Sequence, residues 1–163
     1  MKNTALYFLL IACLWFTSCA TRKVAQGTSV SPLTEADLRK HDYYFLEATR
    51  QREMENHADA LALYEHCLSL NPQSAAVMYE LAQYYAFLQM SARSRALLEK
   101  AVELQPDNFW YRQTLGAYYR SIKEMDKAIA LYEDMSQQFP ARGELLMMLM
   151  DLYAQLQDYP NLI

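Results

Sequence analysis

The sequence predicts an all-α fold with an internal repeat, and three observations support this prediction. Pro72, Pro106 and Pro140 follow one another at intervals of 34 residues, and a fixed period of this length is the signature of repeat architectures. The 163 residues are 53% hydrophobic and include three glycines and five prolines, a composition typical of helical globular proteins. Thirteen tyrosines and nine methionines supply large side chains that fill gaps between stacked helices.

The residues between the prolines repeat in the same order. The clearest copy reads Leu115, Gly116, Ala117, Tyr118 and Tyr119, followed by Ala128, Tyr132 and Pro140. This order resembles the tetratricopeptide repeat, a helix–turn–helix unit of about 34 residues. The resemblance covers roughly residues 41–163. It implies a solenoid of about three and a half repeats, at residues 41–74, 75–108, 109–142 and 143–163, the last incomplete.

The first nineteen residues are typical of an export signal. One positive charge at Lys2 precedes twelve mostly apolar residues, 5–16, fewer than the roughly twenty that span a bilayer as a helix. Phe16-Thr17-Ser18-Cys19 resembles the end of a bacterial lipoprotein signal. The resemblance implies that residues 1–18 are a signal peptide and that Cys19 carries a diacylglycerol and further acyl chains such as palmitate. An uncleaved signal anchor or an ordinary cleaved signal is the alternative.

Residues 19–33 show no apolar periodicity and are interpreted as a flexible tether between the membrane and a repeat domain at residues 34–163. The residues after Cys19 are Ala20-Thr21-Arg22-Lys23, without the acidic residues that often accompany surface display in Bacteroidetes lipoproteins. By this resemblance, we expect a protein lipid-anchored in the bacterial cell envelope, in the outer membrane and facing the periplasm.

Both ends of the repeat region carry specific expectations. Thr34 is predicted to cap a first helix that runs to about Glu55. Residues 145–150 are six hydrophobic residues in a row, which indicates a helix buried on more than one side. The sequence stops at Ile163, where the second helix of repeat 4 should begin. We therefore expect that the natural chain continues, or that a partner or a second copy covers this edge.

Several function classes find no support in the sequence. The net charge is −4 without a cluster of Lys and Arg, so a nucleic-acid partner is not expected. The glycines form no phosphate-binding loop. His41, His57 and His66 lack metal-ligand spacing and are interpreted as solvated or packing residues, and Cys67 as a buried structural thiol. We expect no enzyme activity, no cofactor and no metal.

The family resemblance also implies a ligand-facing groove formed by the first helix of each repeat. The candidate groove residues are Phe45, Arg52, Tyr79, Gln83, Phe87, Trp110, Gln113, Arg120 and Met147. Aromatic residues together with arginine are the usual anchors of protein–protein interfaces. Two alternatives remain: Phe87 and Trp110 only pack one repeat on the next, or the aromatic row holds a glycan.

The predicted function is a non-catalytic protein-interaction scaffold of the cell envelope, which captures a peptide or helical segment of a partner in its groove. Two alternatives are kept. The repeats are the N-terminal part of a longer envelope enzyme or sensor, or the protein is an assembly factor for outer-membrane proteins.

Overall fold

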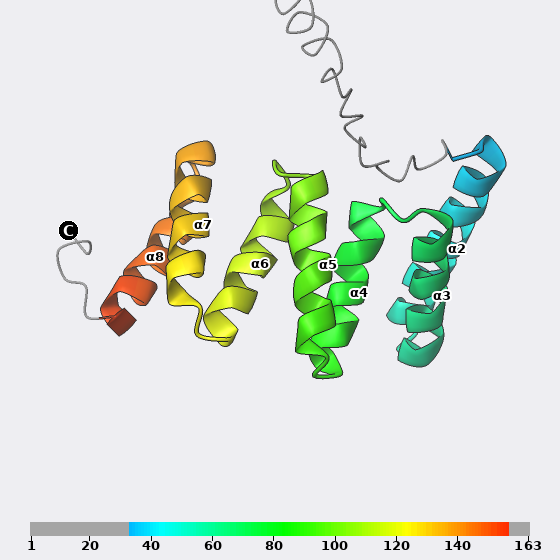
Figure 1. The fold of residues 1–163 in the computed structure, drawn as a ribbon, viewed down its shortest axis with the longest axis horizontal. Coiled ribbons are helices and arrows are strands. Elements are labelled where there is room, and N and C mark those ends of the chain that lie inside the picture. The colour runs from blue at the N-terminus through cyan, green and yellow to red at the C-terminus, as the bar shows by residue number, and fades with distance from the viewer. Residues whose placement is uncertain (1–32, 157–163) are drawn as a thin grey trace, which may run out of the picture. The chain divides into compact units, whose positions relative to one another are not determined.

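The computed structural model describes residues 33–156, which contain seven α-helices and no β-strand (Figure 1). The helices are α2 (Glu35–Glu53), α3 (His57–Leu70), α4 (Ala75–Phe87), α5 (Ser91–Leu104), α6 (Phe109–Ser121), α7 (Met125–Gln138) and α8 (Gly143–Leu156). Each helix packs against the next along the chain. Within the described part, no helix combines the length and the apolar character needed to cross a membrane. The leader, Cys19 and the proposed tether up to Pro32 lie outside the described residues.

The 34-residue period of the sequence is present in the helix boundaries. The first helices of repeats 2, 3 and 4 begin at Ala75, Phe109 and Gly143, and the second helices of repeats 1, 2 and 3 begin at His57, Ser91 and Met125. Pro72, Pro106 and Pro140 each follow the end of a second helix by two residues, because proline lacks the N–H that would extend the helix. The predicted all-α repeat fold is confirmed.

Side-chain oxygen atoms cap two of the helices at their N-termini. The Thr34 hydroxyl accepts a hydrogen bond from the Asp37 backbone N–H at 3.1 Å, as the sequence predicts. The Asn108 side chain accepts from the N–H groups of Trp110 and Tyr111 at the start of α6. Such bonds satisfy N–H groups that have no partner inside the helix. Helix α2 ends at Glu53, two residues before the predicted Glu55.

The turn inside each complete repeat contains one non-glycine residue in the left-handed backbone conformation. These residues are Glu55, Gln89 and Lys123, with φ of 61°, 58° and 63°. At the second turn, Gln89 N–H donates to the Ala86 carbonyl, and Met90 N–H donates to the Tyr85 carbonyl. These two hydrogen bonds together form a Schellman motif, and the other two turns have the same pair of hydrogen bonds. The motif closes the first helix and reverses the chain into the second.

Small residues allow close contact between the two helices of a repeat. A Cβ atom built on Gly116 would lie 2.6 Å from the Tyr132 ring, so α6 and α7 meet too closely for a side chain there. In repeat 2 the buried Ser94 hydroxyl donates a 2.8 Å hydrogen bond to the Ala82 carbonyl. Cys67 is also fully buried, and burial raises the pKa of its thiol to about 11. Its predicted structural role is consistent with this environment.

Candidate functional site

The candidate groove residues lie on the first helices of the repeats, α2, α4, α6 and α8. We call the side of the protein that these four helices share the first-helix face. A polar contact joins each pair of neighbouring first helices. Arg52 on α2 pairs with Glu80 on α4 at 2.6 Å. The hydroxyl oxygens of Tyr79 and Thr114 lie 3.3 Å apart between α4 and α6. Arg120 on α6 pairs with Asp151 on α8 at 3.1 Å. These contacts join the neighbouring helices that form the face.

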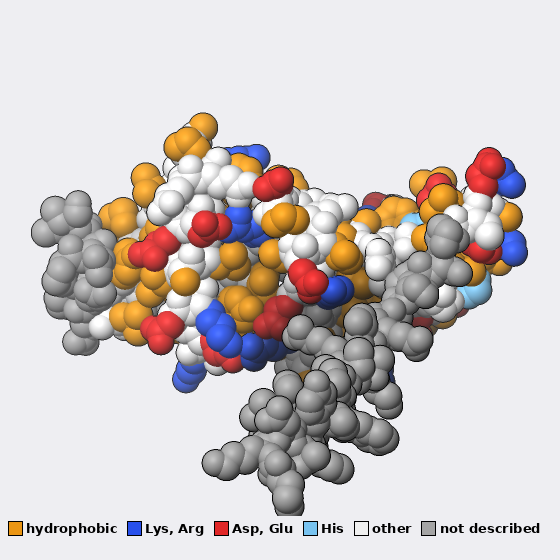
Figure 2. Space-filling view, turned by 45° about the horizontal axis from the view of Figure 1, so that its top comes forward, with side chains coloured by type: hydrophobic (Ala, Val, Ile, Leu, Met, Phe, Trp, Pro, Cys, Tyr) orange, Lys and Arg blue, Asp and Glu red, His pale blue; other side chains and the backbone are white. Residues whose placement is uncertain are grey.

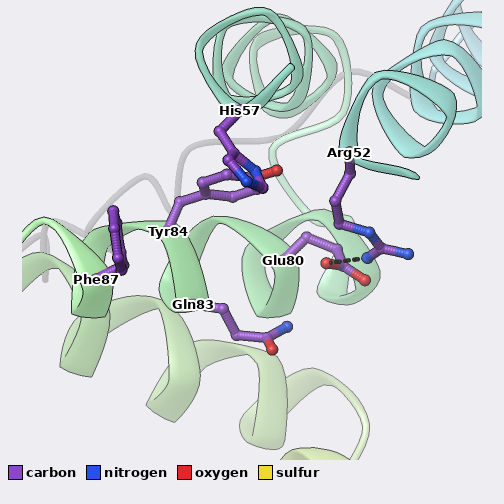
Figure 3. Close-up of a pocket in the computed structure, with 6 residues that line it drawn as sticks. All are labelled: Arg52, His57, Glu80, Gln83, Tyr84 and Phe87. Atoms are coloured by element: carbon purple, nitrogen blue, oxygen red, sulfur yellow. Dashed lines mark hydrogen bonds and ion pairs between the residues drawn. The ribbon is translucent and has the colours of Figure 1, made fainter. Parts of the chain in front are cut away.

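The first-helix face contains a pocket of about 430 Å³ between the first two repeats, which we call the Phe87 pocket (Figure 3). It is lined by Arg52, His57, Glu80, Gln83, Tyr84 and Phe87. The Phe87 side chain is 84% exposed, so its ring is a wall of the pocket and not a part of the core. A volume of this size is large enough to take one or two side chains of a partner.

The charges at the Phe87 pocket are compensated within the protein. The hydrogen bond that Arg52 donates to the Glu80 carboxylate raises the pKa of the Arg52 guanidinium above its usual value. The two charged groups face each other across the pocket edge (Figure 3). Tyr84 lies beside the His57 ring, with 6.1 Å between ring centroids. Burial raises the pKa of the Tyr84 hydroxyl, which stays neutral at physiological pH. The pocket therefore offers apolar walls and a charge-neutral rim.

A second pocket of about 260 Å³ lies farther along the same face, and we call it the Arg120 pocket. It is lined by Gln113, Thr114, Ala117, Arg120, Tyr132 and Met148. Three helices contribute to it, because Tyr132 belongs to α7 and Met148 to α8. The Arg120–Asp151 pair compensates the positive charge here as well. The structure thus divides five of the nine candidate residues between two pockets.

The other four candidate residues line neither pocket. Phe45 is half-buried, with its ring edge-to-face against Tyr64 at 5.8 Å. Tyr79 is half-buried and stacked on Tyr111 at 4.8 Å. By contrast, the side chains of Trp110 and Met147 are 58% and 66% exposed.

The exposure of Phe87 and Trp110 tests the alternative that these two residues only pack one repeat on the next. Phe87 and Trp110 keep most of their surface accessible, at 84% and 58%, so packing between repeats does not explain their presence. The Arg142 guanidinium lies 4.3 Å from the centroid of the Phe109 ring and 5.8 Å from the centroid of the Trp110 ring. These contacts orient the indole at the start of α6. Figure 2 shows hydrophobic side chains interspersed with acidic and basic ones on one face of the molecule.

Sequence reasoning missed three residues of the Phe87 pocket. Glu80 and Tyr84 lie on α4 between the family's ligand-facing positions, and His57 is the first residue of α3, a second helix. Glu80 follows Arg52 by one repeat length less six residues. This spacing could have predicted an ion pair between neighbouring first helices. Residues 33–156 contain no group of three or more His, Cys, Asp or Glu residues placed to hold a metal ion.

Comparisons with known proteins agree with this architecture. The family model of the tetratricopeptide repeat matches residues 51–117. Among solved structures, MamA of AMB-1 superimposes with a TM-score of 0.67 at 21% identity, covering 76% of this chain and 67% of that chain. MamA 41-end from Desulfovibrio magneticus RS-1 gives a TM-score of 0.63 at 19% identity, with the same two coverages, 76% and 67%. No curated protein sequence matches this chain.

The fold class is therefore the all-α solenoid of tetratricopeptide type, in about three and a half repeats. The matched region spans α3, α4 and α5 with parts of α2 and α6, and it includes every residue that lines the Phe87 pocket.

Proposed function

We propose that this chain is a non-catalytic protein-interaction scaffold that captures an extended or helical segment of a partner protein on its first-helix face. The observation that supports the proposal most directly is the exposure of Phe87 and Trp110, at 84% and 58%. Large exposed aromatic rings lose their contact with water when a partner covers them, which stabilises the complex. Each of them lies on a face whose neighbouring helices are joined by ion pairs within the protein.

The partner segment is expected to be mainly apolar at the Phe87 and Arg120 pockets. Arg52 and Arg120 already have carboxylate partners in Glu80 and Asp151. A charged partner group at either arginine would have to displace an existing ion pair, so charge adds little net affinity there. Apolar side chains can instead enter the two pockets without breaking a contact.

We further propose that Cys19 carries the lipid anchor and that the scaffold works at the bacterial cell envelope, in the outer membrane facing the periplasm. The support is the Phe16-Thr17-Ser18-Cys19 sequence, since two or more acyl chains anchor a protein stably. Labelling cells with radioactive palmitate tests this: the wild type and Cys13→Ser should incorporate label, and Cys19→Ser should not. Equal labelling of the Cys19→Ser variant would overturn the assignment.

The scaffold function is tested by substitution on the first-helix face. Phe87→Ala and Trp110→Ala should each weaken partner co-purification while the helical circular dichroism stays that of the wild type, because both side chains are exposed. Leu46→Ala is the matched control, since Leu46 is 69% exposed on α2 and is not a candidate groove residue. Unchanged co-purification by both aromatic variants would remove them from the binding surface.

A further inference from the structure

We infer that the Phe87 and Arg120 pockets act together and take two apolar side chains, about six residues apart, from one extended segment of the partner. This inference rests on the proposed scaffold function and specifies which segment the first-helix face accepts. The Phe87 pocket lies between α2 and α4, and the Arg120 pocket lies between α6 and α8. Their volumes, about 430 and 260 Å³, suit single side chains rather than a helix, which is about 10 Å across.

The distance between the two pockets sets the spacing of the two anchors. Ion pairs join α2 to α4 and α6 to α8, and the Tyr79 and Thr114 hydroxyls meet between α4 and α6. Packed helices lie about 8–10 Å apart, so two such steps place the pockets about 16–20 Å apart along the face. An extended chain rises about 3.3 Å per residue, and every second side chain points the same way. About six residues therefore cover this distance with both anchors on one side of the segment.

The surface between the two pockets is low enough for a backbone to lie on it. Arg52 and Arg120 stand at the same place in repeats 1 and 3, and repeat 2 has Ala86 at this place. On α6, Ala117 stands one repeat after Gln83. Both alanines are exposed. Because their side chains end at Cβ, they leave room for a backbone to pass from one pocket to the other.

Two side-chain amides are placed to bind this backbone. Gln83 lines the Phe87 pocket, and Gln113 lines the Arg120 pocket. Figure 3 shows the Gln83 side chain apart from the ion pair at the pocket edge. Neither amide has a hydrogen-bond partner among residues 33–156. A side-chain amide both donates and accepts, which matches the unpaired N–H and C=O groups of an extended backbone. A helix pairs these groups within itself and would leave both amides without a partner.

The two pockets differ in size and lining, and this difference orders the anchors. The larger pocket has three rings among its walls, those of His57, Tyr84 and Phe87. Aromatic rings attract a further ring through their faces and edges, so the aromatic anchor belongs there. The smaller pocket has Ala117 and Met148 among its walls and takes an aliphatic anchor. Both anchors are neutral, because the arginine at each pocket is already paired with a carboxylate.

Selection of displayed random peptides on the full chain in mild detergent tests the inference. Enriched peptides should carry an aromatic and an aliphatic side chain about six positions apart. Replacement of either anchor by alanine should weaken binding about tenfold or more in fluorescence anisotropy, because each anchor fills a pocket. Insertion of one residue between the anchors should weaken binding as much, since it turns the second anchor to the other side. Proline midway between the anchors should be tolerated, whereas it would disrupt a helix.

Variants of the protein assign the contacts to residues. Gln83→Met and Gln113→Met should each weaken binding of the selected peptide about threefold or more, because each removes a hydrogen bond. Gln137→Met, at an exposed glutamine on α7, is the control and should bind like the wild type. Ala117→Leu should weaken binding by filling the Arg120 pocket, and Ala96→Leu, at an exposed alanine on α5, should not. Circular dichroism checks that every variant is folded.

The other outcomes overturn the inference, and they separate it from the scaffold function. Peptides that need Phe87 but carry anchors at helical spacing, or that lose binding with the midway proline, would mean that the face captures a helix, and the scaffold function would stand. Binding that needs Phe87 but is unaffected by Ala117→Leu would mean that the two pockets act separately. No enrichment, or peptides that bind Phe87→Ala and the wild type equally, would contradict the scaffold function together with this inference.

Discussion

The Tyr119 hydroxyl on α6 donates a 2.9 Å hydrogen bond to the Glu99 carboxylate on α5 and so joins repeat 3 to repeat 2. Arg95 Nε donates to the same Glu99 oxygen at 2.8 Å. The contact recurs at the 34-residue period: Tyr85 donates to Glu65 at 2.6 Å, one repeat earlier. One repeat later, Tyr153 donates to Glu133. A row of Tyr–Glu hydrogen bonds therefore connects each second helix to the first helix that follows it.

Tyr119→Phe should lower the free energy of unfolding by about 1 kcal/mol, because it removes one hydrogen bond to a charged acceptor and leaves the ring in place. Urea denaturation followed by circular dichroism measures this change. Tyr43→Phe is the matched control on α2, where the side chain is 65% exposed, and it should change stability little. A loss no greater than that of the control would show that the hydrogen bond contributes nothing to the contact between repeats.

Gly116→Ala should destabilise the protein by about 1–3 kcal/mol, although alanine is the better helix former. The added methyl group would lie 2.6 Å from the Tyr132 ring, which is only 2% exposed, so the ring or helix α7 would have to shift. Gly143→Ala is the control, since nothing lies within 4 Å of its added Cβ, and it should leave stability equal or slightly higher. Thermal unfolding of both variants compares them, and a neutral Gly116→Ala would contradict the close contact.

Gln89→Gly should stabilise the protein by about 0.5–1 kcal/mol. Gln89 has a φ of 58°, a conformation that costs a side chain energy but costs glycine little. Gln105→Gly is the control at a helix end with a φ of −134°, where glycine only adds freedom to the unfolded chain and should destabilise. Urea midpoints that move in the same direction for both variants would refute this explanation.

Stability should decrease as the pH falls below about 4.5. The hydrogen bond from Arg50 lowers the pKa of Glu47 from 4.5 to about 2, and the bond from Lys127 lowers the pKa of Glu124. A carboxyl with a lowered pKa in the folded state stabilises the protein above its unfolded pKa, and this contribution is lost as protons bind. Melting temperatures should therefore fall between pH 4.5 and 2. Glu47→Gln should show a shallower decline, and an identical pH profile would contradict the role of this pair.

The fold was predictable because its determinants are local and periodic. Pro72, Pro106 and Pro140 each follow the last residue of a helix by two residues, because proline cannot extend a helix. The Thr34 hydroxyl caps the start of α2. The left-handed turn residues were not predictable in the same way. Glu55, Gln89 and Lys123 are not glycines, so residue type gave no signal, and only the surrounding Schellman hydrogen bonds reveal their conformation.

The candidate site was predictable in position but not in detail. Family spacing places Phe87 and Trp110 on first helices, but only packing shows that both remain exposed. Tyr79 and Phe45 have the same predicted orientation, yet rings from neighbouring helices cover part of them, Tyr111 and Tyr64 respectively. These contacts join residues far apart in the sequence, and therefore depend on how the repeats stack.

Photo-crosslinking from the Phe87 pocket in intact cells tests the central proposal most directly. A photoreactive amino acid at Gln83, an exposed residue of the pocket wall, should crosslink to a mainly apolar segment of one partner protein, and Phe87→Ala should reduce the yield. The same amino acid at Ala96, an exposed residue on α5, should give no such adduct. Equal yields from the two positions, or a yield from Gln83 that Phe87→Ala leaves unchanged, would contradict capture on the first-helix face.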